Sequence, residues 1–208
     1  MTLLFSAAFY AMAFLLMIHL QNVLGYGPLE AGVAYLPYGA GILGGLWLSS
    51  RAVLRFGVRP TLVTSFLISS VGLLLLSGVA QGDGYASGVL PGMLVTSLGC
   101  GLALPALTVA ALTGTTEDDA GLGSALFSSV QQVGGAVGLA VLVTLAVHRG
   151  DALTDSIGPS LAATHGYSFA LIVAAVLLAL GAVVIAALLG GGRSPSEADS
   201  GASAAQQG

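Results

Sequence analysis

The stretch from Gly27 to Pro60, GPLEAGVAYLPYGAGILGGLWLSSRAVLRFGVRP, decides the fold of this chain. Pro28 suits the first turn of a helix, and Glu30 lies where the positive end of the helix dipole favours an anion. Residues 31–50 then carry no charged side chain. This length is close to the roughly 20 apolar residues that a bilayer-spanning helix needs. The stretch therefore predicts a transmembrane helix.

Three arginines set around Gly57 follow this helix and form a predicted cytoplasmic loop motif. They are Arg51, Arg55 and Arg59. Basic loops stay on the cytoplasmic side of a membrane, so this loop sets the orientation of the whole chain. By alternation we expect both termini in the cytoplasm. Arg193 then lies on the same side, and Arg149 alone lies outside.

The composition is that of a membrane protein. The chain has 208 residues, of which 56% are hydrophobic and 7% charged. Soluble domains carry about 25% charged residues, so we expect the lipid bilayer to surround this chain. The net charge of −4 argues against a nucleic-acid partner. Cys100 is the single cysteine and excludes an internal disulfide, and we expect no metal and no cofactor.

The charged residues divide the chain into six apolar segments, which predicts an all-α integral membrane bundle of six transmembrane helices. The expected spans are residues 3–24, 28–50, 60–80, 85–112, 117–147 and 167–189. Thr116 is the expected N-cap of the fifth helix, with Glu117, Asp118 and Asp119 in its first turn. We expect a long polar loop over residues 148–166. Residues 1–190 then form the bundle, and residues 191–208 a disordered cytoplasmic tail.

A short internal repeat is visible. Glu30-Ala31-Gly32 opens the second expected helix, and Asp119-Ala120-Gly121 opens the fifth. Three spans invert the direction of the chain, so helices 1–3 and 4–6 would form a 3+3 inverted repeat, as in many secondary transporters. Acid-Ala-Gly is also simply a good helix start, and the three residues favour neither interpretation over the other.

Several motifs together resemble a known family. They are the run from Leu20 to Tyr26 that leads into Pro28–Gly32, the loop Arg55–Pro60, and the run from Gln132 to Gly138. The chain resembles the carboxy-terminal half of a major facilitator superfamily transporter, of the fourteen-helix drug/proton antiporter branch. The resemblance implies one half of a major facilitator fold. It also implies a cytoplasmic-membrane protein that moves small amphipathic substrates outward against proton entry.

The chain departs from that family in two ways. The family carries an acid before the arginine of the loop signature, whereas Leu54 stands here. Arg55 and Arg59 are therefore expected to act as anchors at the inner surface rather than in a gating charge pair. Only about half of such a transporter is present, and the middle of each span lacks the ionisable groups that mark proton relays. Transport would need a second six-helix bundle, either another copy of this chain or an amino-terminal half.

Polar and aromatic side chains within the spans are the candidates for lining a substrate cavity, because drug-sized ligands bind in apolar sites with a few polar groups. They are Tyr10, Phe14, Tyr35, Tyr38, Gln131 and Gln132. For the tyrosines, an interfacial anchor or simple packing is slightly favoured over a substrate contact. The two glutamines can equally form hydrogen bonds between helices.

Glycines gather in the second and fifth expected helices. They are Gly39, Gly41, Gly44, Gly45, Gly134, Gly135 and Gly138. Small residues let helices approach closely. In a transporter the two glycine faces would meet the other half of the molecule, and tight packing within the bundle explains them almost as well.

The leading hypothesis is a transporter, one half of a multidrug efflux proton antiporter. The alternative is a membrane scaffold or gene remnant that does not transport. An intramembrane serine protease would need a histidine at membrane depth beside Ser124. His19, His148 and His165 all lie near the ends of spans. We therefore expect no enzyme activity.

Overall fold

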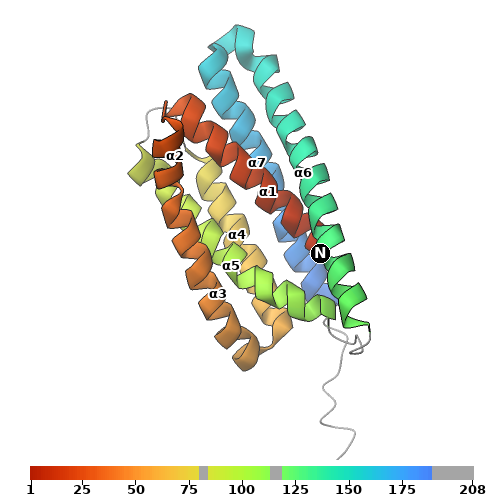
Figure 1. Cartoon of the computed structure of the whole chain (residues 1–208). Helices are drawn as coiled ribbons and strands as arrows, with labels where there is room; N and C mark the ends of the chain where they lie inside the picture. The colour runs from red at the N-terminus through yellow and green to blue at the C-terminus, as the bar shows by residue number, and fades with distance from the viewer. Residues whose placement is uncertain (80–83, 113–118, 189–208) are drawn as a thin grey trace, which may run out of the picture.

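A computed structural model describes residues 1–79, 84–112 and 119–188 of the chain as a bundle of helices (Figure 1). In chain order the elements are α1 (Thr2–Ile18), η1 (His19–Val23), α2 (Pro28–Ala34), α3 (Leu36–Phe56), α4 (Val58–Ser77), η2 (Tyr85–Val89), α5 (Leu90–Leu112), α6 (Ala120–Ile157) and α7 (Pro159–Leu188). Within these residues six helical segments are long and apolar enough to cross a bilayer. The expected all-α membrane bundle is confirmed.

The helices pack in an order that differs from their order in the chain. α5 lies against both α3 and α4, α4 also lies against α7, and α6 packs against both α1 and α7 at one edge of the bundle. The apolar window of Pro28–Phe56 and that of Gly121–Thr154 are each 22% buried, against 44–56% for the other spans. The α2–α3 segment and α6 therefore have the largest uncovered sides.

The second span is divided at Tyr35. α2 ends at Ala34, and α3 begins at Leu36 with Pro37 in its first turn. Proline lacks the N–H that would continue the hydrogen bonding of α2, so the helix is interrupted there. At the start of α2 the Gly27 N–H donates to Glu30 Oε2 over 3.0 Å, as the expected helix start requires.

The expected arginine loop is shorter than the sequence indicates. Arg51 and Arg55 lie in α3, Arg59 lies in the first turn of α4, and Gly57 alone separates the two helices. Its φ of +87° and ψ of 171° fall in a region that is essentially restricted to glycine. The predicted loop motif is therefore a tight helix–glycine–helix turn.

The prediction of a long polar loop over residues 148–166 is wrong. α6 continues to Ile157, α7 begins at Pro159, and Gly158 alone forms the turn, with a φ of +84°. Charged residues such as Arg149 and Asp151 mark where a helix meets water, and they do not end it. Proline is favoured at the first position of a helix, so Pro159 starts α7 directly after the glycine.

Two expectations fall on undescribed residues. Thr116, Glu117 and Asp118 lie outside the described part, and so does the tail of residues 191–208. Asp119 occupies the N-cap position of α6 rather than its first turn.

Glycines bring the helices of the bundle close together. A Cβ at Gly45 of α3 would lie 2.5 Å from the Leu98 carbonyl oxygen of α5. A Cβ at Gly138 of α6 would lie 2.1 Å from the Ala7 Cβ of α1. Of the two interpretations of these glycines, the structure favours packing within the bundle at both crossings. Gly39 differs, because a Cβ there would meet nothing within 4 Å.

Candidate substrate site

A chain of aromatic rings connects three of the expected cavity residues across α1 and the α2–α3 junction. The Tyr35 and Tyr38 ring centres lie 4.9 Å apart. Tyr38 lies 6.5 Å from Phe9, and Phe9 lies 5.5 Å from Tyr10 in an edge-to-face arrangement. Aromatic pairs at these separations attract one another beyond the burial of their area. The rings therefore form one cluster that extends from the bundle interior to the surface.

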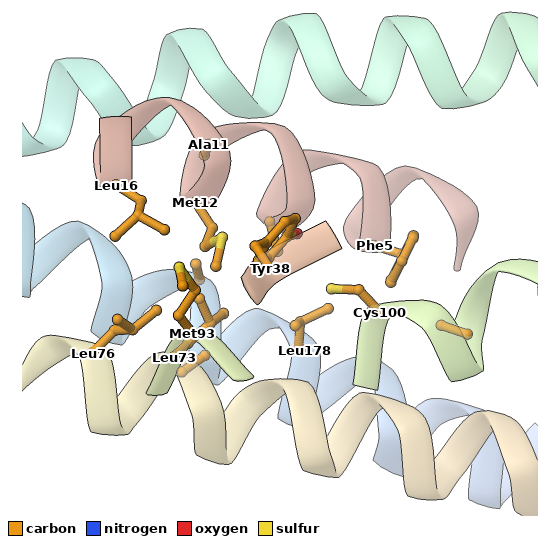
Figure 2. Close-up of a cluster of buried hydrophobic side chains, with 14 of the residues drawn as sticks. Phe5, Ala11, Met12, Leu16, Tyr38, Leu73, Leu76, Met93, Cys100 and Leu178 are labelled. Atoms are coloured by element: carbon orange, nitrogen blue, oxygen red, sulfur yellow. The ribbon is translucent and has the colours of Figure 1, made fainter. Parts of the chain in front are cut away.

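Tyr38 is the buried end of this cluster. Its side chain is 4% exposed and lies among the apolar side chains of the core, between Met12 and Cys100 (Figure 2). Tyr35 is half-buried three residues earlier, on the other side of Pro37. The Tyr38 ring, after the break between α2 and α3, therefore lies in the core, and the Tyr35 ring, at the break, lies closer to the surface.

The hydroxyl oxygens of Tyr35 and Tyr38 are both buried, and neither has a hydrogen-bond partner within the described residues. The Cys100 thiol, a weak hydrogen-bonding group, interacts with the Tyr38 hydroxyl without meeting hydrogen-bond geometry, and its Sγ lies 3.9 Å from Ser69 Oγ. In contrast, the Tyr85 hydroxyl donates to the Ala34 carbonyl oxygen over 2.5 Å. Buried polar groups are nearly always paired, so two neighbouring unpaired hydroxyls indicate a place for a ligand or a water.

Tyr10 is the exposed end of the cluster. Its side chain is 42% exposed and its ring lies against α6, where a Cβ at Gly135 would be 2.6 Å from a ring carbon. Gln131 is half-buried one helical turn before Gly135. The structure therefore places Gln131 near the edge of the tyrosine cluster.

Phe14 and Gln132, the other two expected cavity residues, are more separate. Phe14 is 43% exposed one turn after Tyr10, and none of the ring contacts found among the described residues involves it. Gln132 is exposed on α6. Neither glutamine amide forms a hydrogen bond within the described part of the chain, so the alternative of interhelical bonding finds no support there.

Sequence reasoning missed Phe9, whose ring connects Tyr10 to Tyr38. The only signal for it was its position next to Tyr10, because contacts between α1 and α3 depend on the packing of the bundle.

Sequence reasoning also missed the contacts that hold the arginine side chains in place. Arg59 donates to the Ala186 carbonyl oxygen of α7, and the Arg51 guanidinium lies 3.5 Å from the Trp47 ring centre.

His19 lies apart from the tyrosine cluster. Its ring is 6.5 Å from that of Tyr167, beside a cavity of about 20 Å³ between α1, α4 and α7. That volume holds a single water molecule. His19 therefore has a local ring contact near the end of its span and no part in the tyrosine cluster.

The family of the chain follows from its sequence and matches this fold. A family model for the Major Facilitator Superfamily matches residues 1–139. This chain belongs to the Major Facilitator Superfamily. It is accordingly a multi-pass membrane protein.

Relatives in this family are named for the export of antibiotics or for resistance to them. The chain is 34% identical to the puromycin resistance protein pur8 of Streptomyces alboniger, over 80% of this chain and 35% of the relative. It is 33% identical to the lincomycin resistance protein of Streptomyces lincolnensis, over 69% of this chain and 30% of the relative. A probable actinorhodin transporter of Streptomyces coelicolor is 36% identical over 69% of this chain and 25% of the relative. The chain thus spans about a third of the length of the relatives it matches.

Proposed function

We propose that this chain forms one six-helix bundle of an efflux transporter that exports small amphipathic compounds in exchange for protons. The observation that carries the proposal is the aromatic cluster with the two buried hydroxyls of Tyr35 and Tyr38 inside it. Sites for drug-sized ligands combine apolar surface with a few polar groups that fix orientation, and this cluster has that composition. The names of the relatives from Streptomyces alboniger and Streptomyces lincolnensis support antibiotics as the substrate class.

A second six-helix bundle completes the transporter. The chain spans about a third of the relatives' length, and the α2–α3 segment and α6 are its least covered spans. Among the described residues the acids Glu30, Asp119, Asp151 and Asp155 lie near the ends of helices. A proton-coupling carboxylate at membrane depth would therefore come from the second bundle.

The arginine end of the bundle faces the cytoplasm, and both termini lie on that side of the cytoplasmic membrane. Arg51, Arg55 and Arg59 surround the Gly57 turn, whereas Arg149 lies near the Gly158 turn. An excess of arginine sets orientation by remaining on the cytoplasmic side.

Puromycin transport in vesicles tests the proposal. Inside-out vesicles are prepared from cells that express this chain alone, or together with the amino-terminal part of the Streptomyces alboniger relative. We expect puromycin to enter the paired vesicles when their lumen is acidic, and a protonophore to abolish this uptake. If the chain binds no puromycin and the paired vesicles take up none, the chain is a membrane scaffold that does not transport.

The glutamines of α6 are tested in the same vesicles. We expect Gln131→Ala combined with Gln132→Ala to lower puromycin uptake, because the two amides lie on the helix that contacts Tyr10. Ser128→Ala, one turn earlier on α6, is the matched control and should leave uptake unchanged. Normal uptake by the double variant would contradict a substrate role for these amides.

A further inference from the structure

An apolar groove runs between α3 and α4 at the arginine end of the bundle. Its volume is about 370 Å³, and Leu102 of α5 forms part of its floor. The walls are apolar apart from threonine side chains. They include Leu48, Ala52 and Phe56 of α3, and Pro60, Thr64 and Ile68 of α4. Ligand sites in proteins commonly have this size.

The groove lies along the helix axes. Its walls repeat every four residues on each helix, over residues 48–56 on α3 and 60–68 on α4. Side chains four residues apart lie on the same face of a helix. Eight residues of helix span about 12 Å. The groove therefore extends from the Gly57 turn toward the middle of the membrane, in the direction of a lipid acyl chain.

Two arginines of α3 lie next to groove residues. Arg55 precedes Phe56 at the end near the Gly57 turn, and Arg51 precedes Ala52 one turn farther along the groove. The Arg55 guanidinium lies 5.4 Å from the ring centre of Phe56, which is itself a wall of the groove. Arg51 is stacked on Trp47 one turn earlier on α3. Within the described residues neither arginine forms an ion pair, and both side chains are exposed. Their hydrogen-bond donors remain available to an anion.

We propose that the groove between α3 and α4 binds an anionic phospholipid, with one acyl chain along the groove and the phosphate group on Arg55 and Arg51. Guanidinium groups pair with phosphate through two parallel hydrogen bonds. A free phosphate ion would leave the apolar walls open to lipid. A helix of another protein would cover the walls but leave the two positive charges unmatched unless it carried acids there. An anionic lipid matches both parts of the site.

Trp47 supplies a direct probe, because it is the only tryptophan in the chain. Its ring lies under Arg51, and Trp47 directly precedes Leu48, the groove residue of α3 that is farthest from the Gly57 turn. Brominated phospholipids quench tryptophan fluorescence only at short range. The purified chain is reconstituted in phosphatidylcholine vesicles that contain either brominated phosphatidylglycerol or brominated phosphatidylcholine at the same mole fraction. One arginine beside a membrane surface favours an anionic lipid by about fivefold, so we expect phosphatidylglycerol to be preferred at Trp47 by at least that factor.

Two variants separate the parts of the site. Arg55→Gln removes the charge and should lower the preference for phosphatidylglycerol several-fold. Arg149→Gln is the matched control, because Arg149 also lies over a phenylalanine, 5.9 Å from the Phe169 ring centre, but on α6. Arg149→Gln should leave the preference for phosphatidylglycerol at Trp47 unchanged. Ala52→Leu keeps the charge and fills the groove, and it should lower the preference as well.

The outcomes are distinct. Equal quenching by both lipids in the unaltered chain would overturn the proposal, and so would no quenching by either, because a protein partner would then cover the groove. A preference that Arg55→Gln removes and Ala52→Leu leaves intact would also overturn it, since headgroup attraction alone would explain that result. If a variant fails to fold, native mass spectrometry of the unaltered chain from mixed lipid still tests the site by the lipid class that it retains. The proposal does not depend on transport, so puromycin uptake and lipid preference can fail separately.

Discussion

At the scale of single residues, the unpaired Tyr38 hydroxyl has a cost that can be measured. A buried donor without a partner lowers stability by about 1–3 kcal/mol. We therefore expect Tyr38→Phe to raise the free energy of unfolding of the chain by about 1 kcal/mol. If the hydroxyl contacts substrate, the same variant should weaken puromycin binding. Thermal unfolding in detergent and equilibrium binding of puromycin measure the two effects.

Tyr85 is the matched control for this prediction. Its hydroxyl donates to the Ala34 carbonyl oxygen, so Tyr85→Phe should lower stability by about 1 kcal/mol. We therefore expect Tyr38→Phe to raise the free energy of unfolding and Tyr85→Phe to lower it. A Tyr38→Phe variant that loses stability as Tyr85→Phe does would show that Tyr38 has a partner in the folded chain.

The close approach of α1 and α6 at Gly138 gives a second prediction. A Cβ at this position would lie 2.3 Å from the Ala7 Cα, which is backbone and cannot rotate away. Overpacking in a tight core costs about 1–3 kcal/mol, so Gly138→Ala should lower the free energy of unfolding by that amount. Gly39→Ala is the control, with nothing within 4 Å of the added methyl group. It should be neutral or slightly stabilising, and equal losses in the two variants would contradict this account of the α1–α6 packing.

Sequence alone could propose Tyr10, Tyr35 and Tyr38 of the aromatic cluster, but it missed Phe9 and could not place the four residues together. Tyr35 and Tyr38 are three residues apart, so their proximity follows from the chain itself. Their connection to Tyr10 through Phe9 depends on how α1 meets α3, which no spacing reveals. The same reason explains the glycines, because a small side chain indicates a close approach without showing which helix comes close. The substrate role of all six candidates stays a prediction.

At the scale of elements, two glycines form the tightest turns of the bundle. Gly57 joins α3 to α4 with φ of +87° and ψ of 171°, and Gly158 joins α6 to α7 with φ of +84° and ψ of 157°. A side chain in this region costs about 1–3 kcal/mol. We expect Gly57→Ala and Gly158→Ala each to lower the free energy of unfolding by about that amount.

Gly121→Ala is the control for these two variants. Gly121 lies in the first turn of α6, and a Cβ there meets nothing within 4 Å. Chemical unfolding of the three variants in detergent checks the prediction. A loss for Gly121→Ala as large as the losses at the two turns would mean that space, rather than backbone conformation, determines the effect.

The elements also show how far hydropathy alone predicts structure. The six apolar segments are confirmed, because a bilayer imposes a length on every span. The prediction of a loop over residues 148–166 was wrong because hydropathy detects the membrane boundary, whereas a helix ends where its backbone hydrogen bonds end. The break at Pro37 shows the opposite error, because hydropathy predicted one continuous helix there. Pro37 lies inside an apolar segment, and the structure divides the helix just before it.

At the scale of the whole molecule, the internal repeat has support beyond the two acid-Ala-Gly starts. In the repeat, α1 corresponds to α5, and α3 corresponds to α6. The two cross-pairs are both in contact, because α1 packs on α6 and α5 packs on α3. The second and third helices of each triplet are joined by a single glycine with nearly the same backbone angles, Gly57 in one and Gly158 in the other. These correspondences agree with two triplets of shared design, although α6 packs closely on α7 whereas their counterparts α3 and α4 meet much less.

The two glycine turns lie at opposite ends of the bundle, which makes the orientation testable (Figure 1). The natural Cys100 is buried at 2% exposure and should not react with a maleimide, so it can remain in place. Leu54→Cys lies beside the Gly57 turn, and Ala152→Cys lies in the last turns of α6, and both positions are exposed. If the arginine end is cytoplasmic, a membrane-impermeant maleimide added to intact cells should label Ala152→Cys and leave Leu54→Cys unlabelled. Inverted vesicles should give the reverse pattern. Labelling of Leu54→Cys in intact cells would place the arginines outside, against the rule that basic turns remain in the cytoplasm.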